Sequence, residues 1–183
     1  MAKHVVGVVV GSAHRGSINQ KVATALEKLA DGQVRFKQIQ IDDLPMFSQD
    51  LEGAVPESVE RLRREVKGVD GLLFVTPEYN RSLPPLLTNA IAWASRPYGH
   101  NVWAGKPAAI MGASIGPIRT ANAQAHLKTI LGYLDVRLIG QPEVYIHFQP
   151  ELVADDGTIA DAGLRGVLEA KIAALAGWVA KLA

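Results

Sequence analysis

Residues 5–20 read Val-Val-Gly-Val-Val-Val-Gly-Ser-Ala-His-Arg-Gly-Ser-Ile-Asn-Gln, and this stretch decides the fold. The run from Val5 to Val10 is rich in β-branched residues, which predicts a strand buried on both faces. Gly11 ends the run, and a helix is expected to begin at Ser17, where Ser17 and Gln20 fit a capping box. The stretch therefore predicts a buried strand, a glycine-rich loop and the start of a helix.

The rest of the chain repeats this alternation. Further strands are expected at residues 34–41, 71–75, 108–111 and 136–139, and helices at residues 17–29, 56–67, 86–94, 120–134 and 164–182. Alternating strands and helices predict an α/β fold, a three-layer sandwich with helices on both faces of a parallel sheet. Five strands fit the flavodoxin-like order 2-1-3-4-5. The chain has 183 residues and no linker or repeat, so one domain over residues 1–183 is expected.

Composition excludes several classes of function. Hydrophobic residues make up 48% and charged residues 20% of the chain, and the formal net charge is only +1, which argues against disorder and against a nucleic-acid partner. The absence of cysteine excludes disulfides, thiolate nucleophiles and iron–sulfur clusters. The five histidines show no metal-ligand spacing, so no metal site is expected. No segment reaches membrane-spanning length and the N-terminal apolar run is too short for a signal peptide, so we expect a cytoplasmic protein without a membrane partner.

The loop from Gly11 to Asn19 has the composition of a phosphate site. In a sheet of this order, ligands bind beyond the carboxyl ends of the strands, where the first and third strands diverge. Ser12, Ser17 and Asn19 offer neutral donors beside a helix N-terminus, and Arg15 offers a charged donor. Ser17 stands where a P-loop requires lysine, which argues against ATP chemistry. The alternative is a glycine-rich turn in which Ser17 is only a helix cap.

The loop after the third strand runs from Thr76 to Pro85 and is stiffened by prolines. Such a loop can hold donors at the fixed points that the rim of a flavin ring requires, and Tyr79 can pack on a planar ring or on a neighbouring subunit. The alternative is a rigid proline turn without a ligand. The uncharged helix at 86–94 is expected to be buried, inside the domain or between subunits. Small residues around Ser114 would lie near the same ring.

These segments resemble the NADPH-dependent FMN reductase family, most of all its chromate and quinone reductase branch. The match extends over nearly the whole chain, and its most specific part is Thr76-Pro77-Glu78-Tyr79-Asn80. The other matching segments are Gly11-Ser12, Ser17-Ile18-Asn19, Asn89-Ala90-Ile91-x-Trp93, Ser95-Arg96-Pro97, Gly105-Lys106-Pro107, Ser114-x-Gly116 and Gln124-x-His126-Leu127.

The resemblance implies a homodimer or homotetramer that binds FMN, oxidises NADPH or NADH, and reduces quinones, free flavins, chromate or azo compounds. Because the cofactor carries this chemistry, no catalytic side chain is assigned. The residues that the resemblance places at the FMN are Ser12, His14, Arg15, Ser17, Ile18, Asn19, Pro77, Glu78, Tyr79, Asn80, Arg81 and Ser114.

Two segments depart from the family pattern. His14-Arg15 stands where the family usually has Arg-Lys, and residues 117–120 replace a Gly-Gly-Ala-Arg run. Two other functions remain open from the residues. The first is a flavodoxin-like electron carrier, which would not oxidise NAD(P)H by itself. The second is a flavin-free relative that acts as a regulator or scaffold.

Overall fold

The computed structural model describes residues 4–30, 32–154 and 156–182. Its strands are β1 (Val5–Val10), β2 (Arg35–Gln38), β3 (Gly71–Val75), β4 (Pro107–Ser114), β5 (Arg137–Leu138) and β6 (Tyr145–His147). Its helices are α1 (Ile18–Leu29), α2 (Glu57–Lys67), α3 (Pro85–Ala94), α4 (Ala121–Tyr133) and α5 (Ala162–Leu182), with short 3-10 helices at Gln49–Leu51 and Pro150–Leu152.

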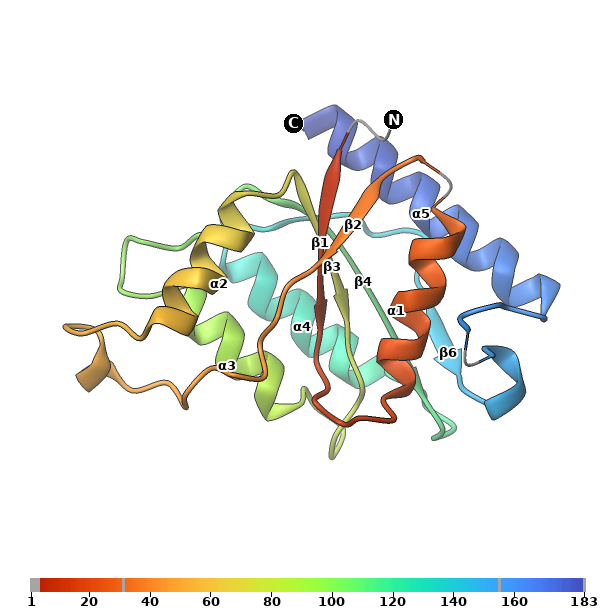
Figure 1. Cartoon of the computed structure of the whole chain (residues 1–183), viewed down its shortest axis with the longest axis horizontal. Coiled ribbons are helices and arrows are strands. Elements are labelled where there is room, and N and C mark those ends of the chain that lie inside the picture. The colour runs from red at the N-terminus through yellow and green to blue at the C-terminus, as the bar shows by residue number, and fades with distance from the viewer. Residues whose placement is uncertain (1–3, 31, 155, 183) are drawn as a thin grey trace.

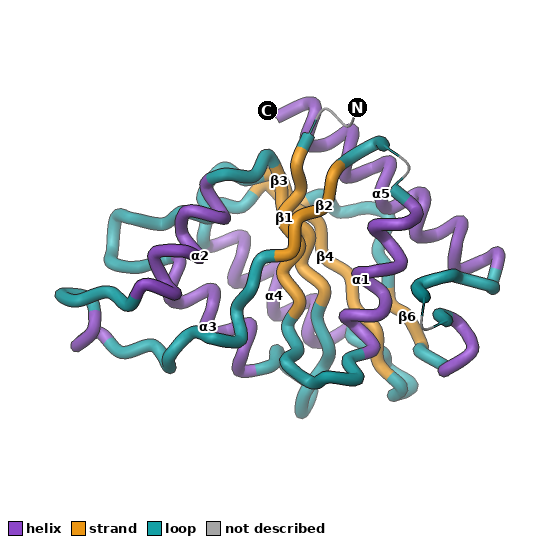
Figure 2. The backbone as a smooth tube through the Cα atoms, in the orientation of Figure 1, coloured by secondary structure: helices purple, strands orange, loops and turns teal. Residues whose placement is uncertain are grey.

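The strands form one parallel sheet in the order β2-β1-β3-β4-β5, as predicted, and β6 pairs with β4 beyond β5. Helices cover both faces, with α1 and α5 on one side and α2, α3 and α4 on the other (Figure 1). Figure 2 shows the strands as a central layer between these helices, with β6 set apart from the rest. The predicted three-layer α/β sandwich is therefore confirmed.

The core is divided in two by the sheet. Successive residues of β1 face opposite sides, so that Val8 packs in the cluster with α1 and α5 whereas Val9 packs in the cluster with α2, α3 and α4. Both side chains are at most 1% exposed. Burial on both faces explains why β1 is continuously apolar. Of the helices in the described part of the chain, none is both long and apolar enough to cross a membrane.

The edge of the sheet at β5 differs from the prediction. The expected strand at 136–139 is only the two-residue β5, and the chain then leaves β4 and returns to it as β6. Pro142 lies in the interval and has no amide hydrogen to donate to a ladder, which favours a break there. β4 is correspondingly longer than predicted, because β6 pairs with its last three residues, 112–114.

Helix α3 is buried inside the chain. Leu87, Ala90 and Trp93 are fully covered by the fold, and the indole of Trp93 donates to the carbonyl of Pro45 over 2.7 Å. Of the two explanations considered for this uncharged helix, burial within the chain accounts for these side chains.

Candidate functional site

Three loops meet at the carboxyl edge of the sheet, after β1, β3 and β4 (Figure 1). The amide of Gly11 donates to the carbonyl of Val75 over 2.9 Å, which joins the ends of β1 and β3. A Cβ atom on Gly11 would lie 3.0 Å from Cγ of Pro84 and 3.3 Å from Cδ of Pro77. This tight contact favours glycine at position 11, and it holds the first two loops against each other.

The first loop is closed by its own hydrogen bonds. Ser17 caps α1, since its Oγ accepts from the amide of Gln20 over 3.2 Å. His14 Nδ1 accepts from the amide of Gly16 over 3.1 Å, and the His14 carbonyl accepts from the amide of Ser17. The side chain of His14 is thus used within the loop, although it is exposed.

The start of α1 retains free donors. Within the described residues, the amides of Ile18 and Asn19 have no hydrogen-bond partner, as expected for the first turn of a helix. Arg15 is exposed, and among those residues it forms no ion pair. Ser12 is half-buried at the base of the loop. Free amides beside an unpaired guanidinium make a site suited to an anion.

The side chain of Asn19 is used within the fold. Its side chain is 1% exposed and forms two hydrogen bonds with Ala113 of β4. Nδ2 donates to the Ala113 carbonyl over 3.0 Å, and Oδ1 accepts from the Ala113 amide over 2.9 Å. The side-chain amide therefore pairs with the backbone of β4 as a neighbouring strand would, and the group of Asn19 left for a ligand is its backbone amide.

The second loop contains a two-residue turn. The amide of Tyr79 donates to the carbonyl of Ser82 over 3.0 Å and the reverse bond measures 2.9 Å. Asn80 and Arg81 between them have φ values of 50° and 64°. Asn tolerates this left-handed conformation, whereas for Arg81 it costs about 1–2 kcal/mol. The turn leaves Tyr79, Asn80 and Arg81 exposed at the edge of the molecule.

Glu78 anchors this loop to α4. One carboxylate oxygen accepts from the amide of Ala123 over 3.0 Å, and the side chain is only 6% exposed. The N-cap residue of α4 makes no side-chain cap of its own, so Glu78 supplies it from 45 residues away. Ser82 Oγ lies 3.0 Å from Nδ1 of His126, also on α4. The carboxylate of Glu78 thus fixes the position of the loop, and the predicted place of Glu78 at the flavin ring stays a prediction.

The third loop is also tied down at its start. Ser114 is half-exposed, its Oγ accepts from the amide of Gly116 over 3.1 Å, and its carbonyl accepts from Phe148. Gly112 lies beneath the second loop, where a Cβ would come within 2.1 Å of the Thr76 carbonyl oxygen. The predicted small-residue segment thus allows β4 to approach the end of β3 closely.

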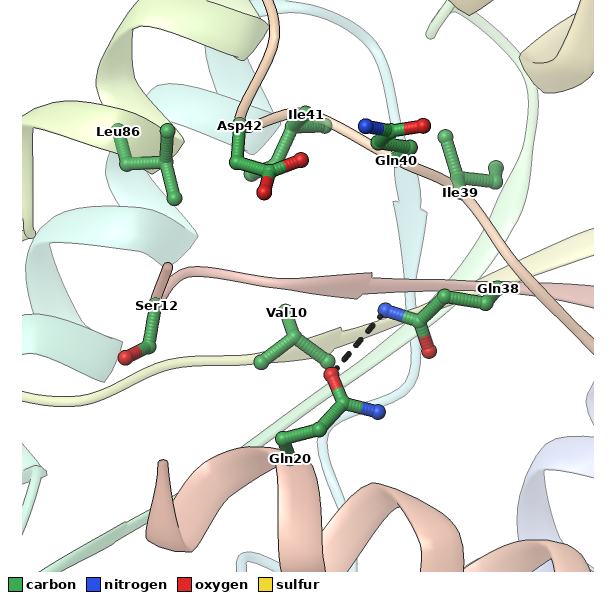
Figure 3. A pocket seen from close by; sticks show the side chains of 9 residues that line it. All are labelled: Val10, Ser12, Gln20, Gln38, Ile39, Gln40, Ile41, Asp42 and Leu86. Carbon is green, nitrogen blue, oxygen red and sulfur yellow. Dashed lines mark hydrogen bonds between the residues drawn. The ribbon is translucent and has the colours of Figure 1, made fainter. Parts of the chain in front are cut away.

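A cavity of about 390 Å³ opens beside Ser12, on the β2 side of the first loop. Among its lining residues, Gln38 Nε2 donates to Oε1 of Gln20 over 3.4 Å, and Asp42 and Gln40 come from the segment that follows β2 (Figure 3). Sequence reasoning assigned no function to residues 38–42. Their position after the carboxyl end of β2 was the signal that could have included them.

Comparison with known proteins agrees with this arrangement. The family described as NADPH-dependent FMN reductase matches residues 5–151. The chain is 44% identical over 174 residues to a 2-hydroxy-1,4-benzoquinone reductase of Burkholderia sp, with 95% of each chain covered. It is 42% identical over 175 residues to a quinone reductase of Pseudomonas putida, covering 95% of this chain and 94% of that protein.

Among solved structures, the flavoenzyme NAD(P)H:(acceptor) oxidoreductase FerB from Paracoccus denitrificans superposes with a TM-score of 0.94. The two chains are 42% identical, and 98% of each is covered. Both the fold and the expected relationship are confirmed. The chain belongs to the NADPH-dependent FMN reductase family and is a flavodoxin-like oxidoreductase that works with FMN and NAD(P)H.

Proposed function

We propose that the first loop holds the phosphate of FMN and that the chain passes electrons from NADPH or NADH to a quinone. The observation that carries the phosphate assignment is the N-terminus of α1, where the amides of Ile18 and Asn19 have no partner among the described residues and the exposed Arg15 precedes them in the same loop. A phosphate can accept from all three groups, and Ser12 adds a hydroxyl at the base of the loop. The residues present therefore fit a phosphate-bearing cofactor.

The ring of the cofactor is assigned to the second and third loops. Residues 77–81 form a stiff, anchored turn with exposed polar groups, and Ser114 stands at the end of the adjacent strand. His14 and Ser17 support the phosphate loop through the bonds they already make. Bound FMN supplies the redox chemistry, taking a hydride from NAD(P)H and giving two electrons to the acceptor. The chain's own residues bind, orient and shield it.

The acceptor is assigned from the relatives, several of which are named quinone reductases. Free flavins, chromate and azo compounds are further acceptors of the proposal, because a reduced flavin open to solvent can reduce them too. One domain over residues 1–183, located in the cytoplasm, would carry this activity.

A homodimer or homotetramer is part of the same proposal. Tyr79, Ile115 and Ile118 are 46%, 75% and 43% exposed, and all three lie on the loops of the site. Exposed apolar side chains beside a ligand site are typical of a subunit interface. Light scattering at micromolar concentration would measure the assembly, and a fully active monomer would contradict it.

The phosphate assignment is tested by titration with FMN and with riboflavin, which lacks the phosphate. FMN should bind at least tenfold more tightly, and equal affinities would refute the assignment. The activity is tested by following NADPH and NADH oxidation with a benzoquinone as acceptor. Steady turnover by the purified protein supports the enzyme, whereas a protein that binds FMN but does not oxidise NAD(P)H would be an electron carrier.

A further inference from the structure

A second cavity lies at the break in the sheet edge, between β5 and β6. It measures about 360 Å³ and is bounded by β4, α4, α5 and the segment after β5. Ile110 and Leu138 form an apolar wall, and Gln124, Lys128, Glu143 and Lys171 supply the polar groups. None of these residues was assigned to the flavin site.

Lys171 on α5 is the unusual member of this set. It is only 2% exposed, and its Nζ donates to the carbonyl of Pro142 over 2.8 Å. In the described part of the chain that carbonyl is its one acceptor, although an ammonium has three donors. A buried ammonium with unused donors is costly unless something else satisfies it.

Lys106 provides a comparison within the same chain. Its Nζ donates to two carbonyls, of Lys67 and Val69, at 3.1 and 2.5 Å. Lys67 is the last residue of α2 and Val69 lies just after it, so Lys106 has a structural role at a helix C-terminus. Lys171 has no equivalent set of acceptors, and its remaining donors adjoin a cavity.

The charges around the cavity leave one positive charge in excess. Lys128 and Glu143 form a close ion pair with each other. Glu143 is therefore already neutralised, and the described residues place no carboxylate within salt-bridge distance of Lys171. A ligand with a single negative charge would compensate Lys171 and use its free donors, while the wall of Ile110 and Leu138 would accept an apolar body.

We propose that this cavity is a binding site for a small monocarboxylate with an apolar body, anchored by the ammonium of Lys171. The site is separate from the three loops and does not depend on the proposed redox activity. Lys128 also lines the cavity, and Glu143, held by Lys128, disfavours ligands with a second negative charge.

Titration of the neighbouring groups supports the same role. Burial lowers the pKa of Lys171 to about 8. The hydrogen bond that Lys128 donates to Glu143 raises the pKa of Lys128 and lowers the pKa of Glu143. Burial raises the pKa of Tyr145. Between pH 7 and 9, Lys171 is thus the group of these four whose charge changes, and ligand affinity should fall as its proton is lost.

The test is calorimetric titration of the FMN-loaded protein with isovalerate, using the neutral isovaleramide as a control. Isovalerate should bind to wild type, isovaleramide should bind at least tenfold more weakly, and Lys171→Met should lose the difference. Lys106→Met, which removes a half-buried lysine away from the cavity, should retain it. Equal binding of acid and amide, unchanged binding in Lys171→Met, or no binding of isovalerate at 20 mM (about the upper limit for a specific site) would overturn the proposal.

A measurement on wild type covers the case in which Lys171→Met does not fold. Isovalerate affinity should fall by about tenfold between pH 7 and 9, because at pH 9 a group with a pKa of about 8 is about nine-tenths deprotonated. A flat profile over this range would show that the ammonium is not the anchor.

Discussion

Replacing Asn19 by Ala should both destabilise the protein and weaken FMN binding. The change removes the two hydrogen bonds to Ala113, at 3.0 and 2.9 Å, and leaves the amide and carbonyl of a fully buried residue unpaired. An unsatisfied buried group costs about 1–3 kcal/mol, so leaving two of them unpaired should cost about 2–6 kcal/mol. For a chain of this length, that lowers Tm by roughly 4–24 °C.

The effect on FMN follows from the position of Asn19 in the first turn of α1. Its side chain ties the proposed phosphate loop to β4, so its loss should let the free amides of Ile18 and Asn19 move. We expect about tenfold weaker FMN binding, equivalent to about 1.4 kcal/mol. Flavin fluorescence titration measures this directly, at a temperature well below the Tm of the variant.

Asn89 offers a matched control. It makes the same kind of bidentate contact elsewhere, accepting from the amide of Phe47 over 2.8 Å and donating to the carbonyl of Pro45 over 2.9 Å. Asn89→Ala should therefore be destabilised by a similar amount but bind FMN like wild type. If both variants bind FMN equally well, or if both lose affinity together, Asn19 has no special part in positioning the loop.

Three further changes have expected outcomes. Arg15→Ala should weaken FMN binding by one to two orders of magnitude, because it removes a charged hydrogen bond worth about 1.5–3 kcal/mol. His14→Ala should weaken binding less, because the His14 side chain already bonds within the loop. Fluorescence titration that gives the reverse order of affinities would contradict this. Gly112→Ala should lower Tm by more than about 10 °C or prevent folding, because the added Cβ would lie 2.1 Å from the Thr76 carbonyl oxygen. The expected loss of unfolding free energy is roughly 3 kcal/mol or more. An unchanged melting curve would disprove the close approach. The free energy of unfolding of wild type should rise between about pH 8 and pH 10.5, by up to about 1.4 kcal/mol per pH unit. The reason is that the unfolded chain keeps the Lys171 proton over a range in which the folded chain has released it. Urea unfolding of Lys171→Met should lack this rise, and equal pH slopes of the unfolding free energy for the two proteins would argue against a lowered pKa.

Much of the fold could be predicted because its elements carry strong local patterns. β1 and β3 are continuous apolar runs, and α2 has a clear apolar face with charged residues at both ends. β6 could not be predicted in the same way. It has three residues and follows Pro142, and it exists because β4 offers an unpaired edge, which is a tertiary effect.

The sequence predicts where the loops of the candidate site meet, but not which hydrogen bonds their side chains make. Loops after β1, β3 and β4 meet because parallel strands bring their carboxyl ends to one edge. Asn19, however, pairs with a residue 94 positions away, and Glu78 with one 45 positions away. No local pattern specifies such partners, so the hydrogen bonds that these side chains make within the fold could not be predicted from the sequence.

At the candidate site, some polar side chains hold the loops in place and other groups are left for a ligand. The side chain of Asn19 joins the first loop to β4, and that of Glu78 joins the second loop to α4, while His14 and Ser17 close the first loop on itself. In the part of the chain that the structure describes, the groups left without a partner in the first loop include the amides of Ile18 and Asn19 and the guanidinium of Arg15. Rigid amides lose little conformational entropy when they meet an anion, so side chains that hold the loops in place can set the affinity for the cofactor. Substitutions at these anchors should thus change cofactor affinity and stability together, whereas substitutions of Arg15 should change affinity alone.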